Sequence, residues 1–123
     1  MRRRSFLKGL LATGALTAIS PGLLRAATGD KVRLACIGIG NRGADDVRDL
    51  NATGLAEIVA LCDVDMGAKQ TEPILKMFPN LPRFQDFRKM FDKRGKEMDA
   101  GSIAVPDFAH LPIAMLAMSL GKH

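Results

Sequence analysis

The fold class is indicated most strongly by Val32-Arg33-Leu34-Ala35-Cys36-Ile37-Gly38-Ile39-Gly40-Asn41-Arg42-Gly43. The first half of this stretch is a short apolar run ended by glycine, typical of a strand buried on both faces of a parallel sheet. Its second half has G-x-G-x-x-G spacing. In a dinucleotide-binding unit these glycines would allow a tight turn (Gly38), close approach of a pyrophosphate (Gly40) and packing of the next helix on the strand (Gly43). The pattern alone is weak in a chain with 12 glycines, so its context decides.

The length and charge of the chain limit the classes of function. A chain of 123 residues is typical of one domain or part of one. The formal net charge is +5, but five of the 18 basic residues and none of the 13 acids lie within residues 1–26. The remaining 13 basic residues balance the 13 acids. No excess of basic residues remains beyond residue 26, so we expect no nucleic-acid partner.

Residues 1–27 have the layout of an export signal. A basic segment precedes the apolar run Gly9–Ile19, a helix-breaking Ser-Pro-Gly and small residues at Ala26-Ala27. The apolar run is shorter than the about 20 residues that span a bilayer. The basic segment, Arg3-Arg4-Ser5-Phe6-Leu7-Lys8, resembles a twin-arginine signal. We therefore expect recognition by the export machinery and a periplasmic or otherwise extracytoplasmic location, with a membrane anchor formed by an uncleaved signal as the alternative.

A carboxylate stands where a dinucleotide-binding unit needs one. A helical pattern over Arg42–Thr53 leads to a second buried-strand pattern, Glu57–Cys62, and Asp63 follows it 20 residues beyond Gly43. An acid at about this spacing accepts hydrogen bonds from the adenosine ribose hydroxyls. Its charge would repel a 2′-phosphate, so NAD is favoured over NADP. The alternative is a solvated loop acid, with Asp65 capping the next helix.

The rest of the chain continues the alternation of strands and helices. Proline and glycine mark most of the expected boundaries. The expected elements are a helix over Met66–Phe78 kinked at Pro73, a short strand at Pro82–Gln85, a helix capped by Asp86 and ended by Lys93-Arg94-Gly95, a strand at Ser102–Val105 ended by Pro106, and a last helix ended by Gly121.

The segment Asp107–His110 is expected to be a loop, because Pro112 suits the first position of the last helix. The loop would lie at the carboxyl end of a strand, the edge where open α/β sheets bind ligands. His110 would then point toward the cofactor crevice. A solvated or capping histidine is the alternative.

The two cysteines, Cys36 and Cys62, each lie inside an apolar run. We expect two buried thiols that behave as small apolar side chains, with a disulfide or reactive pair as the alternative. Their spacing matches no zinc pattern, and no metal site is predicted.

Taken together, the leader and four later segments resemble the Gfo/Idh/MocA oxidoreductases. The later segments are Ala35–Gly43, Ala60–Asp65, Pro106–His110 and Ala117–His123. The resemblance implies an NAD(P)-binding Rossmann domain, a doubly wound parallel α/β sheet, present over residues 31–123 as an incomplete sheet of roughly four strands. A second α+β domain, missing from this chain, would carry much of the sugar site. The cofactor-binding positions implied are Gly38, Ile39, Gly40, Asn41, Arg42, Gly43, Asp63, Val64, Pro106 and His110.

The resemblance also implies a reaction whose catalytic group lies elsewhere. Family members continue with a Glu-Lys-Pro stretch whose lysine is a catalytic candidate, and this chain stops at His123. The catalytic residues are therefore unassigned, and this portion alone is expected to be inactive. The expected function is the NAD(P)-binding portion of an exported oxidoreductase that acts on a sugar or polyol by hydride transfer. A homo-oligomer is one expected state of the full-length protein.

Two alternatives to this function stay open. One is an NAD-dependent glycosidase of the same family, in which oxidation of the sugar permits elimination and the hydride is then returned. The other is a noncatalytic module that binds a dinucleotide or a sugar.

Overall fold

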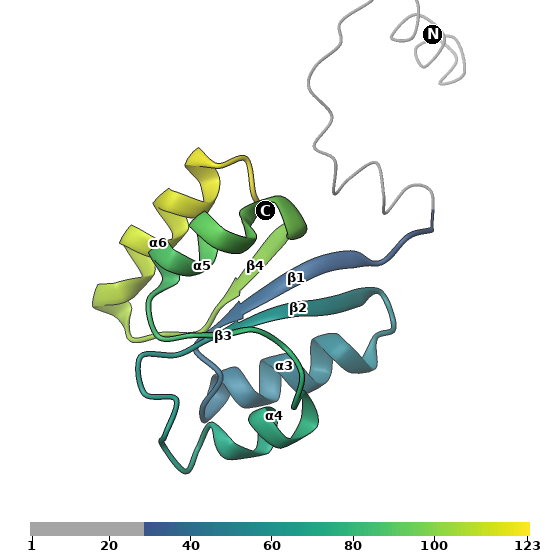
Figure 1. Cartoon of the computed structure of the whole chain (residues 1–123), viewed down its shortest axis with the longest axis vertical. Coiled ribbons are helices and arrows are strands. Elements are labelled where there is room, and N and C mark those ends of the chain that lie inside the picture. Colours follow the sequence, from purple (N-terminus) through teal and green to yellow (C-terminus); the bar gives the residue numbers. More distant parts are fainter. Residues whose placement is uncertain (1–28) are drawn as a thin grey trace, which may run out of the picture.

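The computed structural model describes residues 29–123, which form a parallel four-stranded sheet between two layers of helices (Figure 1). The predicted export signal, residues 1–27, lies outside the described residues. The strand order is β3-β2-β1-β4. The strands are β1 (Val32–Ile37), β2 (Ala56–Cys62), β3 (Arg83–Phe84) and β4 (Ala100–Ile103). The predicted fold class, an incomplete Rossmann-type α/β sheet, is confirmed.

Helices cover both faces of the sheet (Figure 1). They are α3 (Arg42–Ala52), α4 (Glu72–Met77), α5 (Phe87–Arg94) and α6 (Asp107–Ser119), with a short 3-10 turn, η1 (Gly95–Glu97), after α5. Successive strand side chains point to opposite faces. Leu34 and Cys36 therefore join the core under α3 and α4, whereas Ala35 and Ile37 join the core under α5 and α6. Burial on both faces explains why the strands are continuously apolar.

The register of the central strand brings three strand ends to one level. Ile37 at the end of β1 pairs with Cys62 on β2 and with Ile103 on β4. The chain moves outward in one direction from β1 to β2 and β3, and in the other direction to β4, so the strand order reverses beside β1. Ligands of open α/β sheets bind at such a switch point, outside the carboxyl ends of the strands.

The helix predicted over Met66–Phe78 is wrong in its first half, where the chain forms turns before α4 begins. The hydroxyl of Thr71 donates to the carbonyl oxygens of Met66 (3.1 Å) and Ala68 (2.8 Å). Such local bonds compete with the helical ladder. Pro73 does not kink a long helix but lies in the first turn of α4, where its missing N–H costs nothing.

The loop predicted at Asp107–His110 is also wrong, because α6 begins at Asp107. Pro106 holds an extended conformation (φ −55°, ψ 149°) directly before the helix, and Pro112 lies inside it. Pro112 has no N–H to donate to the carbonyl oxygen of Phe108. Both residues are exposed, so water can reach that oxygen.

The ends of α5 follow from the residues beside them, and the bounds of β4 follow from the length of its partner strand. Asp86 caps α5 as predicted, because its carboxylate accepts from the N–H of Arg88 (2.9 Å). The helix α5 ends at Arg94 with Gly95 as its C-cap residue, as predicted, and Gly95 also begins the 3-10 turn. The fourth strand lies two residues before the predicted Ser102–Val105, because its partner β1 ends at Ile37.

Within residues 29–123, no helix is long and apolar enough to cross a membrane.

The end of α6 leads the chain back to the sheet. Gly121 takes a left-handed φ of 71°, and the N–H of Lys122 donates to the carbonyl of Ala117 (2.9 Å), which satisfies the helix end. His123 then exchanges two backbone bonds with the chain around Ala100: its N–H donates to Asp99 (3.2 Å), and its carbonyl accepts from Gly101 (2.8 Å). This is the bonding pattern of a parallel neighbour beside β4.

Candidate cofactor-binding site

A pocket of about 200 Å³ lies at the carboxyl ends of β1, β2 and β4. Four predicted cofactor residues line it: Gly38, Asp63, Val64 and Pro106. Most of the remaining lining is apolar, including Val105 and Phe108. The pocket is smaller than the roughly 300–1,000 Å³ of a typical ligand site, so it suits one end of a dinucleotide while the rest lies along the open edge.

The turn after β1 has room for glycine alone at two positions. Gly38 has a φ of +82°, and a Cβ there would lie 2.1 Å from the carbonyl oxygen of Ala104. A Cβ on Gly43 would lie 2.1 Å from the carbonyl oxygen of Gly38. The first and third glycines thus let β1, β4 and the start of α3 approach one another more closely than any side chain would permit.

The start of α3 presents unused hydrogen-bond donors. Asn41 has a φ of 48° and makes no side-chain cap. Within residues 29–123, no hydrogen bond uses the N–H groups of Gly40, Asn41 or Arg42. Three consecutive free N–H groups at a helix start form a cradle for an anion, and the helix dipole adds a partial positive charge.

Asp63 stands directly beside this cradle. Its Oδ2 accepts from the N–H of Ile39 (3.0 Å), and its Oδ1 accepts from the N–H of Asp65 (3.0 Å). The carboxylate therefore links the glycine turn to the end of β2, a role that sequence reasoning missed. Each oxygen retains acceptor capacity for a ribose hydroxyl. Asp65 does not cap the next helix, because α4 begins only after Thr71.

The other predicted site residues differ in position. Ile39 is fully buried beneath the turn. The guanidinium of Arg42 is exposed and pairs with Asp46 (3.2 Å), one turn along α3. His110 is exposed on α6 and does not line the pocket. Its predicted place near the nicotinamide stays a prediction.

The second glycine is covered by a residue that the sequence did not single out. A Cβ on Gly40 would lie 2.6 Å from Cγ of Gln70. Gln70 belongs to the turns before α4 and carries no periodic or motif signal. Its position follows from the path of those turns.

The two thiols play no part in an ion or disulfide site. Cys36 and Cys62 are free and buried in cores on opposite faces of the sheet. Burial raises the pKa of each thiol to about 12. They are inert apolar side chains, as predicted. Within the described chain, no group of three or more His, Cys, Asp or Glu side chains could hold a metal ion.

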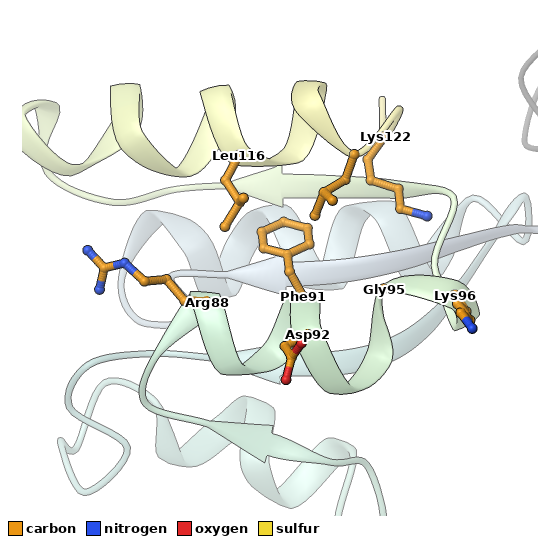
Figure 2. Close-up of a pocket in the computed structure, with 8 residues that line it drawn as sticks. Arg88, Phe91, Asp92, Gly95, Lys96, Leu116 and Lys122 are labelled. Atoms are coloured by element: carbon orange, nitrogen blue, oxygen red, sulfur yellow. The ribbon is translucent and has the colours of Figure 1, made fainter.

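A larger hollow of about 590 Å³ lies between α5 and α6, away from the carboxyl ends of the strands (Figure 2). Phe91 points from α5 toward α6, and Arg88 and Lys96 extend outward at opposite ends (Figure 2). None of the predicted cofactor residues lines this hollow. Its polar groups do not converge on one point, so it is a weaker site candidate.

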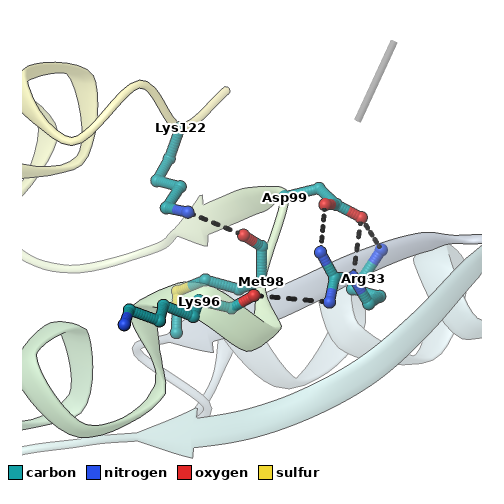
Figure 3. Close-up of polar contacts among 5 residues, drawn as sticks. All are labelled: Arg33, Lys96, Met98, Asp99 and Lys122. Atoms are coloured by element: carbon teal, nitrogen blue, oxygen red, sulfur yellow. Dashed lines mark hydrogen bonds and ion pairs between the residues drawn. The ribbon is translucent and has the colours of Figure 1, made fainter. Parts of the chain in front are cut away.

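A polar cluster at the amino ends of the strands is structural (Figure 3). Arg33 on β1 donates three hydrogen bonds to the carboxylate of Asp99, from Nη2 to Oδ1 (2.7 Å), from Nε to Oδ2 (3.1 Å) and from its backbone N–H to Oδ2 (3.0 Å). This hydrogen bonding raises the pKa of Arg33. Lys122 Nζ donates to the carbonyl of Met98 (3.0 Å). The cluster ties β1, the start of β4 and the end of α6 together at the edge opposite the pocket.

The parallel sheet, its switch point and the glycine cradle beside Asp63 define a Rossmann-type dinucleotide-binding domain. The sequence model of the family described as "Oxidoreductase family, NAD-binding Rossmann fold" (GFO_IDH_MocA) matches residues 32–123. The chain belongs to this family, as the resemblance predicted.

Relatives of the chain carry a common name. It is 33% identical to the "Glycosyl hydrolase family 109 protein" of Stenotrophomonas maltophilia, over 98% of this chain and 28% of the relative. It is 30% identical to the "Glycosyl hydrolase family 109 protein 2" of Shewanella sp. (strain ANA-3), over 98% of this chain and 32% of the relative. The chain thus spans about a third or less of these relatives.

Proposed function

We propose that residues 29–123 hold the pyrophosphate and adenosine ribose of NAD in a longer enzyme. One observation carries this proposal: the three free N–H groups of Gly40, Asn41 and Arg42 lie beside the carboxylate of Asp63 at the switch point of the sheet. The N–H cradle fits a phosphate group, and the carboxylate fits ribose hydroxyls. The preference for NAD over NADP follows from the negative charge of Asp63.

The chain's own residues would bind and orient the cofactor rather than carry the chemistry. The free N–H groups would fix the pyrophosphate, and Asp63 would fix the ribose. The apolar walls formed by Val64, Pro106 and Phe108 would exclude water from a ring in the pocket. When bound, NAD supplies a hydride acceptor for oxidation of a sugar carbon. We assign no catalytic acid or base among residues 29–123.

The names of the relatives favour glycoside cleavage as the overall reaction. We therefore infer a sugar substrate and place an NAD-dependent glycosidase ahead of the sugar or polyol dehydrogenase that the sequence predicted. The dehydrogenase is the second candidate, supported by the oxidoreductase description of the family. In both cases the domain described here would have the same task.

The experiment that separates these reactions follows both products at once. The full-length protein is incubated with NAD and two substrate panels, one of nitrophenyl glycosides and one of free sugars and polyols, and nitrophenol and NADH are recorded together. Nitrophenol release without net NADH supports the glycosidase. NADH accumulation with a free sugar or polyol supports the dehydrogenase. Bound NAD with neither product across both panels supports a noncatalytic module.

We also propose that residues 1–27 direct export by a twin-arginine route. The support is the Arg3-Arg4 pair before the apolar run. Replacement of both arginines by lysine should keep the protein out of the periplasmic fraction, whereas Arg25→Lys should not. Unchanged fractionation of the double variant would contradict the proposal.

A further inference from the structure

We propose that Gln70 is a further cofactor-binding residue, whose side-chain amide donates a hydrogen bond to a phosphate oxygen of the dinucleotide. This inference rests on the proposed function, because it adds a residue to the same site. It starts from the second glycine of the motif, where a dinucleotide's pyrophosphate comes close to the backbone.

Gln70 occupies the space that Gly40 leaves open. A Cβ on Gly40 would lie 2.6 Å from Cγ of Gln70 and 3.4 Å from its Cβ. The stem of the glutamine therefore packs on the bare backbone of the loop. The amide nitrogen lies two bonds beyond Cγ, and Gln70 is exposed, so this donor is accessible beside the N–H cradle.

The position of Gln70 is fixed by its neighbours. Thr71 is buried, with 1% of its surface exposed, and its hydroxyl is bonded to the carbonyls of Met66 and Ala68. Ile74, a few residues further on, is fully buried in the core under α3 and α4. The backbone at Gln70 is thus anchored on its carboxyl side, which limits the backbone entropy that this turn would lose on binding.

The chemistry of the loop leaves a role for a neutral donor. Arg42, the cationic residue of the glycine motif, pairs with Asp46. Within residues 29–123, no hydrogen bond uses the amide of Gln70. A carboxamide has two N–H donors and no charge, so it can bond a phosphate oxygen without disturbing Asp63.

The test compares variants that separate hydrogen bonding from packing. Gln70→Met keeps a side chain of similar length on Gly40 but has no N–H donor. Titration calorimetry of the full-length protein with NAD should show about tenfold weaker binding for Gln70→Met. Gln70→Glu should lose more, because its charge repels the phosphates, and that additional loss should shrink at high salt. Asn80→Asp makes the same charge change in the turn after α4 and should bind NAD normally.

Each outcome decides the question. Unchanged or tighter binding by Gln70→Met would overturn the inference and show that the side chain fills space or obstructs the site. Tighter binding by Gln70→Ala would overturn it for the same reason. Unaltered melting temperatures show that the variants are folded. Binding of NAD by all variants alike would reject this inference alone, whereas absence of binding by the folded unsubstituted protein would reject the proposed function as well.

Discussion

Ile39 and Asp63 are joined by a 3.0 Å hydrogen bond from the backbone N–H of Ile39 to Oδ2 of Asp63. The residue between the first two glycines is thereby tied to the acid at the end of β2. The group that would select the ribose also holds the turn that would receive the phosphates. Substitutions at Asp63 should therefore alter both the loop and ligand binding.

Asp63→Asn should show this double effect. An amide side chain has one acceptor oxygen, so it can keep one of the two backbone bonds that the carboxylate accepts. We expect the free energy of unfolding to fall by about 1 kcal/mol. NAD affinity should fall about tenfold, with a smaller loss for NADP because the repulsive charge is gone. Chemical denaturation measures the loss of stability, and titration with NAD and with NADP measures the two losses of affinity. Asp65→Asn, at an exposed position two residues away, is the control. Equal losses for both cofactors would contradict a ribose role.

Gly38→Ala should be far more damaging than Gly54→Ala. Both glycines have a left-handed φ, +82° and +71°, so both substitutions incur about 1–2 kcal/mol of backbone strain. Only Gly38 has a carbonyl oxygen 2.1 Å from the added Cβ, whereas nothing lies within 4 Å at Gly54. The difference between the two variants in chemical denaturation isolates the steric clash. Similar stabilities would contradict the close approach of β4 to the turn.

Asp99→Asn should destabilise the protein through the Arg33 pair. The side chain of Asp99 is 2% exposed and that of Arg33 is 24% exposed. Removal of one charge from such a pair leaves the other poorly compensated, at a cost of about 3 kcal/mol. Asp45→Asn breaks the exposed Arg48 pair (2.9 Å) and should cost less than about 0.5 kcal/mol. Equal unfolding free energies for the two variants would refute a structural role for the cluster.

The buried thiols should make stability fall at alkaline pH. Burial raises the pKa of Cys36 and Cys62 from 9.0 to about 12. Below pH 9.0 both thiols are protonated in the folded and unfolded chains, and their contribution to stability is fully present. As the pH rises toward 12, the unfolded chain releases these protons first, so this contribution is lost. Denaturation curves across this range should decline more steeply than those of a variant with both cysteines replaced by alanine. Parallel curves would show that the thiols are not buried.

The sequence predicts the elements whose signals are local. β1 and β2 are recognisable because burial on both faces makes their sequences largely apolar. Asp86 and Gly121 mark helix ends through their own backbone chemistry. The start of α6 was mistaken because two prolines, Pro106 and Pro112, both suit a helix start, and local sequence does not say which one begins it.

Features that depend on distant partners escaped prediction. The bounds of β4 follow from the length of β1 rather than from the apolar run at its own end. The bond between Ile39 and Asp63 requires the register of two strands. The contact of Gln70 with Gly40 depends on turns that have no periodic pattern. Motif spacing thus indicated the candidate site, whereas the contacts that support it became visible only in three dimensions.

An NMR titration of the full-length protein with NAD, followed at individual backbone amides, tests cofactor binding by the glycine turn most directly. We predict that the signals of Gly40, Asn41 and Arg42 shift most, because their N–H groups would receive the pyrophosphate, and that the signal of Ile39 shifts with them through Asp63. Shifts confined to the hollow around Phe91, or no shift at the glycine turn at saturating NAD, would contradict the proposed function.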